Sequence, residues 1–311
     1  MKKLGTFLGR GAVLHLLGAM ALATAGCSAG AEDTEGTAAA TEDTIIGGTL
    51  AVAGGHPWMV EVWNNTYPHN PGVPDPDPNT VYPDCGGTLI SPDWVVTAAH
   101  CVHKVDPFTN EYLGPADPWN IYMYLGDYDR SGFGTSTEGG NWEQGRWGIE
   151  VHIHPQYTPS SPGHHDIALV KLDHSAVINA RVKPIAVGSQ TISSNSTAIA
   201  AGWGATASQN PQIPGTEESI ILRRASLTVR TNATCNSSSV GAIRQLDSDE
   251  LCAGDGSHGT CFGDSGGPLI RAVGSSYELI GVTSWGTIYC TGYSVFARVS
   301  SHYNWIRSYV P

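Results

Sequence analysis

Short runs rich in valine, isoleucine and leucine recur along the chain, and glycine, proline, asparagine or aspartate separates them. The 38 glycines and 19 prolines favour turns and disfavour long helices. Such spacing is typical of β-barrels and β-sandwiches. We therefore expect an all-β fold, with strands near residues 58–63, 86–90, 94–98, 121–125, 167–172, 197–201, 219–229, 277–284 and 295–299.

The C-terminal segment, 301–310, is the one stretch with a clear helical pattern. Ser301 can cap it, and its apolar face is formed by Tyr303, Trp305, Ile306 and Val310. Loops are expected where proline alternates with polar residues, over 66–84, 104–120 and 209–215. Residues 173–190 are expected to connect two halves of the chain.

The N-terminal region has the pattern of a bacterial-type export signal. Basic residues precede an apolar stretch, 11–23, that is too short to cross a bilayer as a helix. The residues at the end of this stretch are compatible with two processing sites. Ala23–Ala25 fits the general signal peptidase, whereas Thr24–Cys27 resembles a lipobox, with a lipid attached to Cys27.

The cysteine count favours the lipobox. Export implies an oxidising compartment, and six of the seven cysteines can pair there. The seventh, Cys27, lies where a lipobox requires it, and a free exposed thiol is a liability outside the cytoplasm. We expect 1–26 to be a signal peptide of the lipoprotein type, and 27–44, which is acidic and lacks large apolar residues, to be a disordered propeptide and tether.

The most informative local motif is Gly263–Pro268, in which Ser265 follows Asp264 and precedes two glycines. Small neighbours leave the serine hydroxyl uncovered and let a carbonyl group approach the N–H groups of Gly263 and Ser265. The segment therefore predicts a nucleophile and an oxyanion hole together.

A serine nucleophile needs a base, and the base needs an acid that orients it. His100 follows an apolar strand, and an imidazole with a pKa of about 6.5 can take the serine proton and return it to the leaving group. Asp166 precedes another apolar strand and can fix the tautomer of His100. Alone, each residue has a structural explanation, so the joint pattern carries the prediction.

Thr97–Cys101, Asp166–Leu169 and Gly263–Pro268 resemble, in order and spacing, the three motifs of the chymotrypsin/trypsin-like serine endopeptidases. The resemblance extends from Ile45 to the C-terminus. It implies two packed six-stranded antiparallel β-barrels, over about 45–175 and 190–300, with the active site between them and a helix over 301–310. It also implies a catalytic triad of Ser265, His100 and Asp166, and no required cofactor.

The same resemblance assigns the cysteines and the substrate pocket. It pairs Cys85 with Cys101, Cys235 with Cys252, and Cys261 with Cys290. It puts Gly259 at the pocket floor, and the other substrate-binding residues are Ser284, Trp285, Gly286 and Ser294. Because an arginine or lysine would be buried there unpaired, we predict a neutral residue before the scissile bond. Thr260, Thr283 and Ser294 leave a polar or acidic preference open.

Ile45–Gly48 resembles the new N-terminus that these enzymes gain on activation. Cleavage before Ile45 would free an α-ammonium group for the Asp264 carboxylate, and two such charges are tolerable in the interior only as a pair. That ion pair would set the oxyanion hole. Arginine or lysine usually precedes this bond, but this chain has Thr44. We therefore expect an activating protease of different specificity, or self-processing.

Two metal sites are conceivable, and neither is the preferred interpretation. Asp127, Glu138 and Glu143 lie where some relatives bind calcium, but their spacing differs and a solvated acidic loop explains them. His152 and His154 could chelate zinc from one strand face, although His154 with the proline after it also resembles a family sequence.

Two other functions compete with proteolysis. Gly263–Gly267 also fits the nucleophile elbow of α/β-hydrolase esterases, but that fold needs a histidine after the serine, and only His302 follows. A non-catalytic, protease-like binding module would commonly lack a triad member, and this chain has all three.

We therefore expect an exported serine endopeptidase, made as a monomeric zymogen, that acts on proteins or peptides. A lipid on Cys27 would be its only membrane contact, and activation would release it into the medium. Its net charge of −12 argues against a nucleic-acid partner.

Overall fold

The computed structural model describes residues 45, 48–65, 85–106, 108–109, 111–132, 143–159, 162–206, 218–256 and 258–310. The predicted signal peptide, the tether with Cys27, and the predicted loops over 66–84 and 209–215 lie outside these residues. Among the residues described, no helix has both the length and the apolar character needed to cross a membrane.

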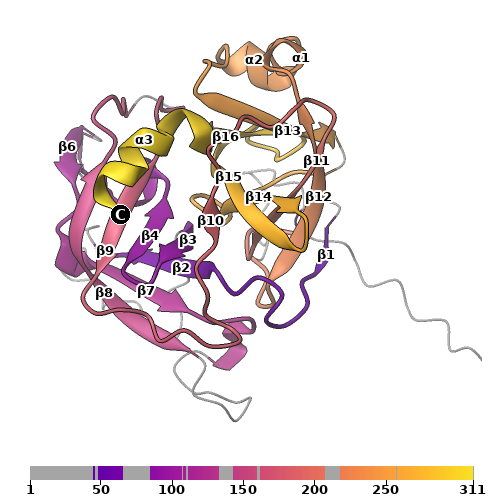
Figure 1. Ribbon diagram of the computed structural model, residues 1–311. Helices are drawn as coiled ribbons and strands as arrows, with labels where there is room; N and C mark the ends of the chain where they lie inside the picture. Colours follow the sequence, from indigo (N-terminus) through magenta and orange to yellow (C-terminus); the bar gives the residue numbers. More distant parts are fainter. Residues whose placement is uncertain are drawn as a thin grey trace, which may run out of the picture. The chain divides into compact units, whose positions relative to one another are not determined.

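Six antiparallel strands close the first barrel (Figure 1). They are β2 (Met59–Asn64), β3 (Cys85–Ser91), β4 (Trp94–Thr97), β7 (Ile121–Leu125), β8 (Gln144–Ile153) and β9 (Ala168–Leu172). Their order around the barrel is β2-β3-β4-β9-β8-β7. Closure leaves no unpaired sheet edge, and the interior is filled by buried apolar side chains, among them Val60, Val62, Val95, Met123 and Leu169.

Six further antiparallel strands close the second barrel. They are β11 (Thr197–Gly202), β12 (Arg223–Arg230), β13 (Glu250–Gly256), β14 (Pro268–Val273), β15 (Ser276–Trp285) and β16 (Gly292–Arg298). The order β12-β11-β14-β15-β16-β13 returns to β12, which pairs with both β11 and β13. Its core contains Leu227, Leu251, Leu269 and Phe296. The two six-stranded barrels confirm the expected fold class.

The barrels pack against each other through a shared apolar cluster. Ile270, Leu279 and Val282 of the second barrel belong to the same buried cluster as the interior of the first. Two short strands extend the second barrel: β1 (Thr49–Leu50) pairs with β12, and β10 (Ala186–Val187) pairs in parallel with β15. The connector between the two halves therefore contains a short strand.

The prediction of a loop over 104–120 was wrong. Strands β5 (His103–Val105) and β6 (Tyr112–Pro115) form a hairpin there, and a short 3-10 helix, Pro118–Asn120, follows. The rings of His103, Tyr112 and Tyr157 pack on one another and stabilise this hairpin. Pro115 and Pro118 lie at the end of the strand and in the first helical turn, where a missing N–H is tolerated.

Helix α3 (Val299–Tyr309) begins at Val299, so the prediction that Ser301 caps it was wrong. It leaves β16 of the second barrel and lies along the first (Figure 1). Ile306 is fully buried, and the Tyr309 ring packs against Trp94 of β4 and His152 of β8. The helix therefore joins the two barrels, and Val299 and Ile306 add to the apolar cluster that they share.

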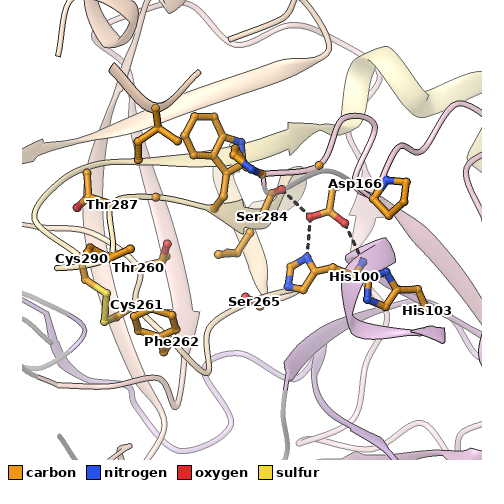
Figure 2. Close-up of a pocket in the computed structure, with 18 of the residues that line it drawn as sticks. His100, His103, Asp166, Thr260, Cys261, Phe262, Ser265, Ser284, Thr287 and Cys290 are labelled. Atoms are coloured by element: carbon orange, nitrogen blue, oxygen red, sulfur yellow. Dashed lines mark hydrogen bonds and ion pairs between the residues drawn. A yellow bond between two sulfur atoms is a disulfide. The ribbon is translucent and has the colours of Figure 1, made fainter. Parts of the chain in front are cut away.

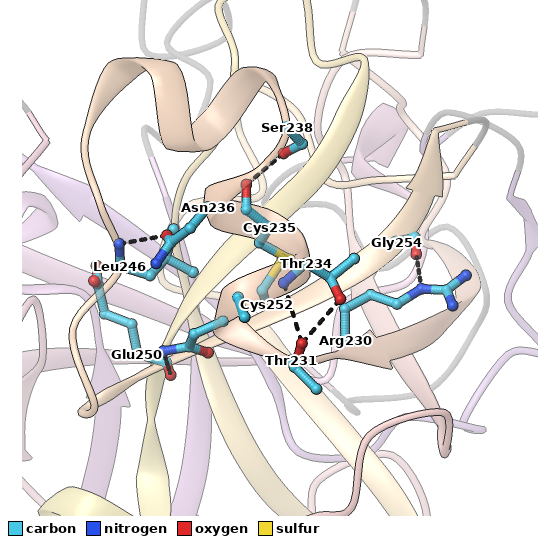
Figure 3. The surroundings of a disulfide bond; sticks show 12 residues. Arg230, Thr231, Thr234, Cys235, Asn236, Ser238, Leu246, Glu250, Cys252 and Gly254 are labelled. Atoms are coloured by element: carbon cyan, nitrogen blue, oxygen red, sulfur yellow. Dashed lines mark hydrogen bonds between the residues drawn. A yellow bond between two sulfur atoms is a disulfide. The ribbon is translucent and has the colours of Figure 1, made fainter.

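Two short helices were not predicted from the sequence. They are α1 (Asn232–Asn236) and α2 (Ser239–Ile243). The Thr231 hydroxyl caps α1, and the disulfide from Cys235 to Cys252 fastens it to β13 (Figure 3). Helices this short depend on such tertiary anchors, because isolated single turns are unstable in water.

Candidate active site

A cavity of about 560 Å³ lies where the two barrels meet, and it contains the predicted triad. His100 and Asp166 come from the first barrel, and Ser265 comes from the loop before β14 in the second. Figure 2 shows Asp166 and Ser265 close to the His100 side chain. Residues more than 60 positions apart in the sequence are thus brought into one pocket.

A short 3-10 helix, Ala99–Cys101, presents His100 directly after β4. Its neighbours Ala99 and Cys101 are buried, and Cys101 forms a disulfide with Cys85 at the start of the adjacent strand β3. The backbone N–H of His100 donates a hydrogen bond of 2.9 Å to Oδ1 of Asp166. The backbone and the side chain of the histidine are therefore both held.

Asp166 is buried two residues before β9 and accepts three hydrogen bonds. Its Oδ2 lies 2.7 Å from His100 Nδ1 and also accepts from the Ser284 hydroxyl at 2.6 Å. Burial opposes ionisation of this carboxyl, but His100 and these hydrogen bonds hold its pKa below the usual range. Ser284, one of the predicted substrate-binding residues, lies on the strand that the family resemblance also places behind this aspartate, and its hydroxyl contacts the acid.

The pKa of the His100 imidazole is raised, whereas that of Asp166 is lowered. Burial by itself lowers its pKa, but the charge and the hydrogen bond of Asp166 outweigh burial and raise the pKa above its ordinary value. With Nδ1 donating to Asp166, Nε2 carries the lone pair of the neutral ring. The remaining nitrogen is thus available as a proton acceptor in the cavity.

The loop that carries Ser265 depends on glycine. Gly263 and Gly266 have φ angles of 89° and 77°, in the left-handed region. A Cβ at Gly266 would overlap the Thr97 hydroxyl and the Gly86 carbonyl, so no other residue fits there. No described residue accepts a hydrogen bond from the N–H of Gly263 or Ser265. The predicted oxyanion hole requires that both N–H groups be unengaged in this way.

Asp264 is 1% exposed and lies beneath this loop. Its carboxylate accepts hydrogen bonds of 2.9 Å from the N–H groups of Gly204 and Cys261. Burial raises its pKa to about 6, although those N–H groups act in the opposite direction. Within the described part of the chain, no basic side chain forms an ion pair with it. Ile45 is fully buried in the core of the second barrel.

The pocket beside the triad is lined by uncharged residues of the second barrel. They include Thr260, Cys261, Thr283, Ser284, Trp285, Gly286, Thr287 and Cys290. Gly259 and Ser294 do not line the cavity, but the Ser294 hydroxyl accepts a 2.8 Å hydrogen bond from the Thr260 N–H. The disulfide Cys261–Cys290 joins the serine loop to this wall (Figure 2). The three disulfides are thus the pairs that the family resemblance implies.

Neither of the two candidate metal sites is assembled among the described residues. Glu138 lies outside the described residues, and Asp127 and Glu143 are not part of any ligand cluster among the described ones. Glu143 instead accepts a hydrogen bond from the Tyr124 hydroxyl. His152 and His154 do not come together: His152 bonds to Glu150, whereas the His154 ring faces two other histidines.

One neighbour of the predicted oxyanion hole, Glu218, lies in no sequence motif. The Glu218 carboxylate lies where a side chain on Gly263 would be, and Arg130 binds it at 3.2 Å. Arg130 also lies 3.4 Å from the buried Glu61. Since these residues belong to no motif and are far apart in the sequence, only the structure connects them.

Comparison with known sequences agrees with the resemblance to trypsin-like serine endopeptidases. The sequence model of the trypsin family matches residues 45–306. Limulus clotting factor C from Carcinoscorpius rotundicauda and clotting factor C from Tachypleus tridentatus are each 32% identical over 251 residues, which cover 75% of this chain and 23% of those proteins. Serine protease 28 from Mus musculus is 30% identical over 281 residues, 86% of this chain and 89% of that protein.

The match to the two clotting factors is partial. The chain corresponds to only 23% of the length of the two clotting factors. All three relatives are animal proteins, which gives no support to the bacterial origin suggested by the export signal.

Proposed function

The chain belongs to the trypsin family of serine endopeptidases, and on this premise we propose that it hydrolyses peptide bonds through an acyl-enzyme formed on Ser265. Enzymes of this family need no cofactor. The observation that carries the proposal is the contact between His100 and Asp166 in the cavity that also holds Ser265. Its substrates are proteins or peptides.

Each residue of the site would have a distinct role in the reaction. Nε2 of His100 takes the proton of the Ser265 hydroxyl as that oxygen attacks the peptide carbonyl, and returns it to the leaving amine. Asp166, fixed by Ser284, keeps Nδ1 protonated and stabilises the imidazolium that forms. The N–H groups of Gly263 and Ser265 bind the oxyanion. Water then repeats the cycle on the acyl-enzyme.

The proposed primary specificity is for a neutral residue before the scissile bond. Among the described residues, those that line the cavity beside the triad include hydroxyls and aliphatic groups but no acid other than Asp166, which His100 already engages. An arginine or lysine side chain in this pocket would leave its charge without a partner. A panel of short peptides differing at this one residue measures the preference, and efficient cleavage after arginine would refute it.

Activation is proposed to occur by cleavage between Thr44 and Ile45. The buried Asp264 carboxylate, with its raised pKa and no basic side-chain partner among the described residues, supports the idea that it receives the α-ammonium of Ile45. Burial of Ile45 in the adjacent barrel core is compatible with that role. N-terminal sequencing of active protein tests this step, because the scheme requires a start at Ile45.

The proposed location rests on the disulfides and the N-terminal region. Three disulfides fit an oxidising compartment, and none of them involves Cys27. A lipid on Cys27 would therefore anchor only the uncut, monomeric zymogen, and cleavage before Ile45 would activate and release it together. Active enzyme that starts at Ile45 but stays in the membrane fraction after a salt wash would contradict this.

A serine-directed fluorophosphonate probe tests the catalytic proposal directly. Correctly processed protein should be labelled on Ser265, and the Ser265→Ala variant, processed in the same way, should not. Absence of labelling in processed, folded protein would instead favour a protease-like binding module.

A further inference from the structure

Three histidines and one aspartate, distant in the sequence, meet beside the catalytic aspartate. His154 follows β8, His165 immediately precedes Asp166, and His302 belongs to α3, and one nitrogen of each lies within 4.8 Å of the others. Asp249, which precedes β13, lies against two of them. We propose that these four side chains, called here the His3Asp cluster, bind one zinc ion.

The spacing of the donor atoms supports a tetrahedral ion. His165 Nδ1 lies 3.0 Å from Asp249 Oδ2 and 3.3 Å from His302 Nε2, and the latter two atoms are 3.9 Å apart. Ligands at about 2.0–2.1 Å from zinc in a tetrahedron are roughly 3.3–3.4 Å from each other. Three of the four ligand atoms therefore need to move by only a few tenths of an ångström.

A hydrogen bond from His302 to the backbone directs the lone pair of its other nitrogen toward the proposed zinc position. Its Nδ1 donates to the Arg298 carbonyl oxygen at 2.9 Å, which leaves Nε2 as the unprotonated nitrogen facing His165 and Asp249. Metal-binding histidines are commonly oriented in this way, by a hydrogen bond from the ring nitrogen that does not bind the metal.

Asp249 supplies a buried carboxylate oxygen that the protein leaves unsatisfied. Its Oδ2 makes no hydrogen bond of good geometry, although the residue is only 9% exposed. The guanidinium of Arg298, which is close, bonds instead to the carbonyl oxygens of Ser248 and Glu250. A buried carboxylate oxygen without a donor is costly, and a metal ion would satisfy it.

His154 is the one ligand that gives up a contact. Its ring stacks on His165 and meets His302 edge-on, while its Nδ1 accepts a long hydrogen bond of 3.3 Å from the Gln156 N–H. Coordination through either nitrogen requires that this weak bond be released.

The ion would have a route of entry and a structural effect. The His165 side chain keeps 26% exposure, whereas His302 is enclosed. Imidazole nitrogens with one carboxylate suit zinc better than the hard cations calcium and magnesium. Binding would tie α3 and the loop before β13 to the residue next to Asp166, across both barrels.

The test uses the full chain with Ser265→Ala, so that self-cleavage does not interfere. After treatment with a chelator, zinc chloride is titrated by calorimetry, and cobalt chloride is titrated by visible absorption. One ion per chain and the intense absorption of tetrahedral cobalt are expected. The thermal unfolding midpoint should rise by roughly 5–10 °C when zinc exceeds its Kd a hundredfold.

Two variants and two controls identify the ligands. His165→Asn keeps a residue that tolerates the φ of 47° at this position, and Asp249→Asn keeps the shape of the carboxylate. Each should weaken zinc binding at least about tenfold. The matched control is His164→Asn, the adjacent histidine, which pairs with Asp247 instead, and it should bind zinc normally.

His100→Ala tests the alternative that zinc binds the triad. Unchanged affinity in this variant is expected. The proposal is overturned if no stoichiometric binding occurs, if His165→Asn and Asp249→Asn bind as tightly as their parent, or if affinity is lost with His100. None of these readouts depends on peptidase activity, so failure here leaves the proposed function untouched.

Discussion

Asp166 holds His100 at two points, because one carboxylate oxygen accepts from the ring Nδ1 at 2.7 Å and the other from the backbone N–H at 2.9 Å. The histidine can therefore neither rotate its ring nor shift its backbone without breaking a charge-assisted hydrogen bond. The base of the proposed reaction is preorganised before any substrate arrives.

Replacing Asp166 by asparagine should keep the fold and remove most of the activity. The amide can donate to Nδ1, which stabilises the wrong tautomer of His100. We expect kcat to fall by about 10⁴-fold, the loss known for the same change in a member of this family. Ester or amide hydrolysis by the purified variant measures it. A loss below about tenfold would mean that Asp166 does not orient the base.

The pH dependence of kcat/KM should reflect the raised pKa of His100. Only the neutral imidazole can accept the serine proton, so activity rises as pH passes through this pKa. Asp166 raises the pKa above 6.5 in spite of burial, and the midpoint of the acidic limb should therefore lie above pH 6.5. A midpoint below that value, with a substrate that does not itself titrate, would contradict the arrangement.

Asp264 should make the stability of the uncut chain fall as pH rises. Its folded pKa of about 6 exceeds the unfolded value of 3.8, so the folded state prefers the protonated form. The contribution is complete below pH 3.8 and is lost as pH rises to about 6, with a total of roughly 3 kcal/mol. Urea unfolding of uncut Ser265→Ala protein, with and without Asp264→Asn, isolates this difference.

Cleavage before Ile45 should reverse that trend. An α-ammonium beside Asp264 favours the ionised carboxylate and lowers its folded pKa below the unfolded value of 3.8, so the parent should be more stable than Asp264→Asn above pH 3.8 and lose that advantage as pH falls through the folded pKa. The same unfolding series on processed protein gives the comparison. Identical pH profiles for cut and uncut protein would argue that Asp264 does not receive the new N-terminus.

A carboxylate at position 259 should change the specificity. A side chain on Gly259 would first meet the Ser294 hydroxyl at 3.1 Å, with two carbonyl oxygens at 3.7 Å, so a small residue can be accommodated. Gly259→Asp should raise kcat/KM for arginine substrates by about 10–100-fold through a charged hydrogen bond. Gly259→Asn is the matched control of equal size, and it should leave arginine substrates poor.

Loss of either of two disulfides should lower stability, but only one loss should also lower kcat/KM. Cys235–Cys252 fastens α1 to β13 (Figure 3), and neither cysteine is among the residues that line the cavity. Removing it with a double alanine change should cost about 3 kcal/mol, or a fall of roughly 6–12 °C in Tm, with kcat/KM nearly unchanged. Removing Cys261–Cys290 should lower kcat/KM as well, because it joins the serine loop to the pocket wall. Equal effects of both on kcat/KM would refute the distinction.

The sequence predicted the parts of the fold whose signals are local. The apolar runs at β2, β7 and β9 gave strands close to their observed bounds, whereas β8 was missed because Arg146, Glu150 and His152 interrupt its apolar pattern. Arg146 is nevertheless buried, since it bonds to Gln144 and to backbone carbonyls. Strand propensity depends on such tertiary partners, which no local window contains.

In the candidate site too, the residues with a local sequence signal were predicted and those that depend on tertiary contacts were not. His100, Asp166 and Ser265 lie in motifs, so spacing along the chain identifies them. Glu218 beside Gly263 and the His3Asp cluster depend on contacts between different strands, loops and a helix, and nothing along the chain points from His154 to His165 and His302. Such sites become visible only when the barrels are assembled.

The N–H of Gly86 donates a 2.7 Å hydrogen bond to the carbonyl oxygen of Ser265, so the nucleophile is fastened to the barrel that carries its base. The consequence concerns protein engineering. A chimera that joins the first half of this enzyme to the second half of a relative could contain every triad residue and remain inactive. The position of its Ser265 relative to His100 would depend on whether the two parents share this hydrogen bond between the barrels.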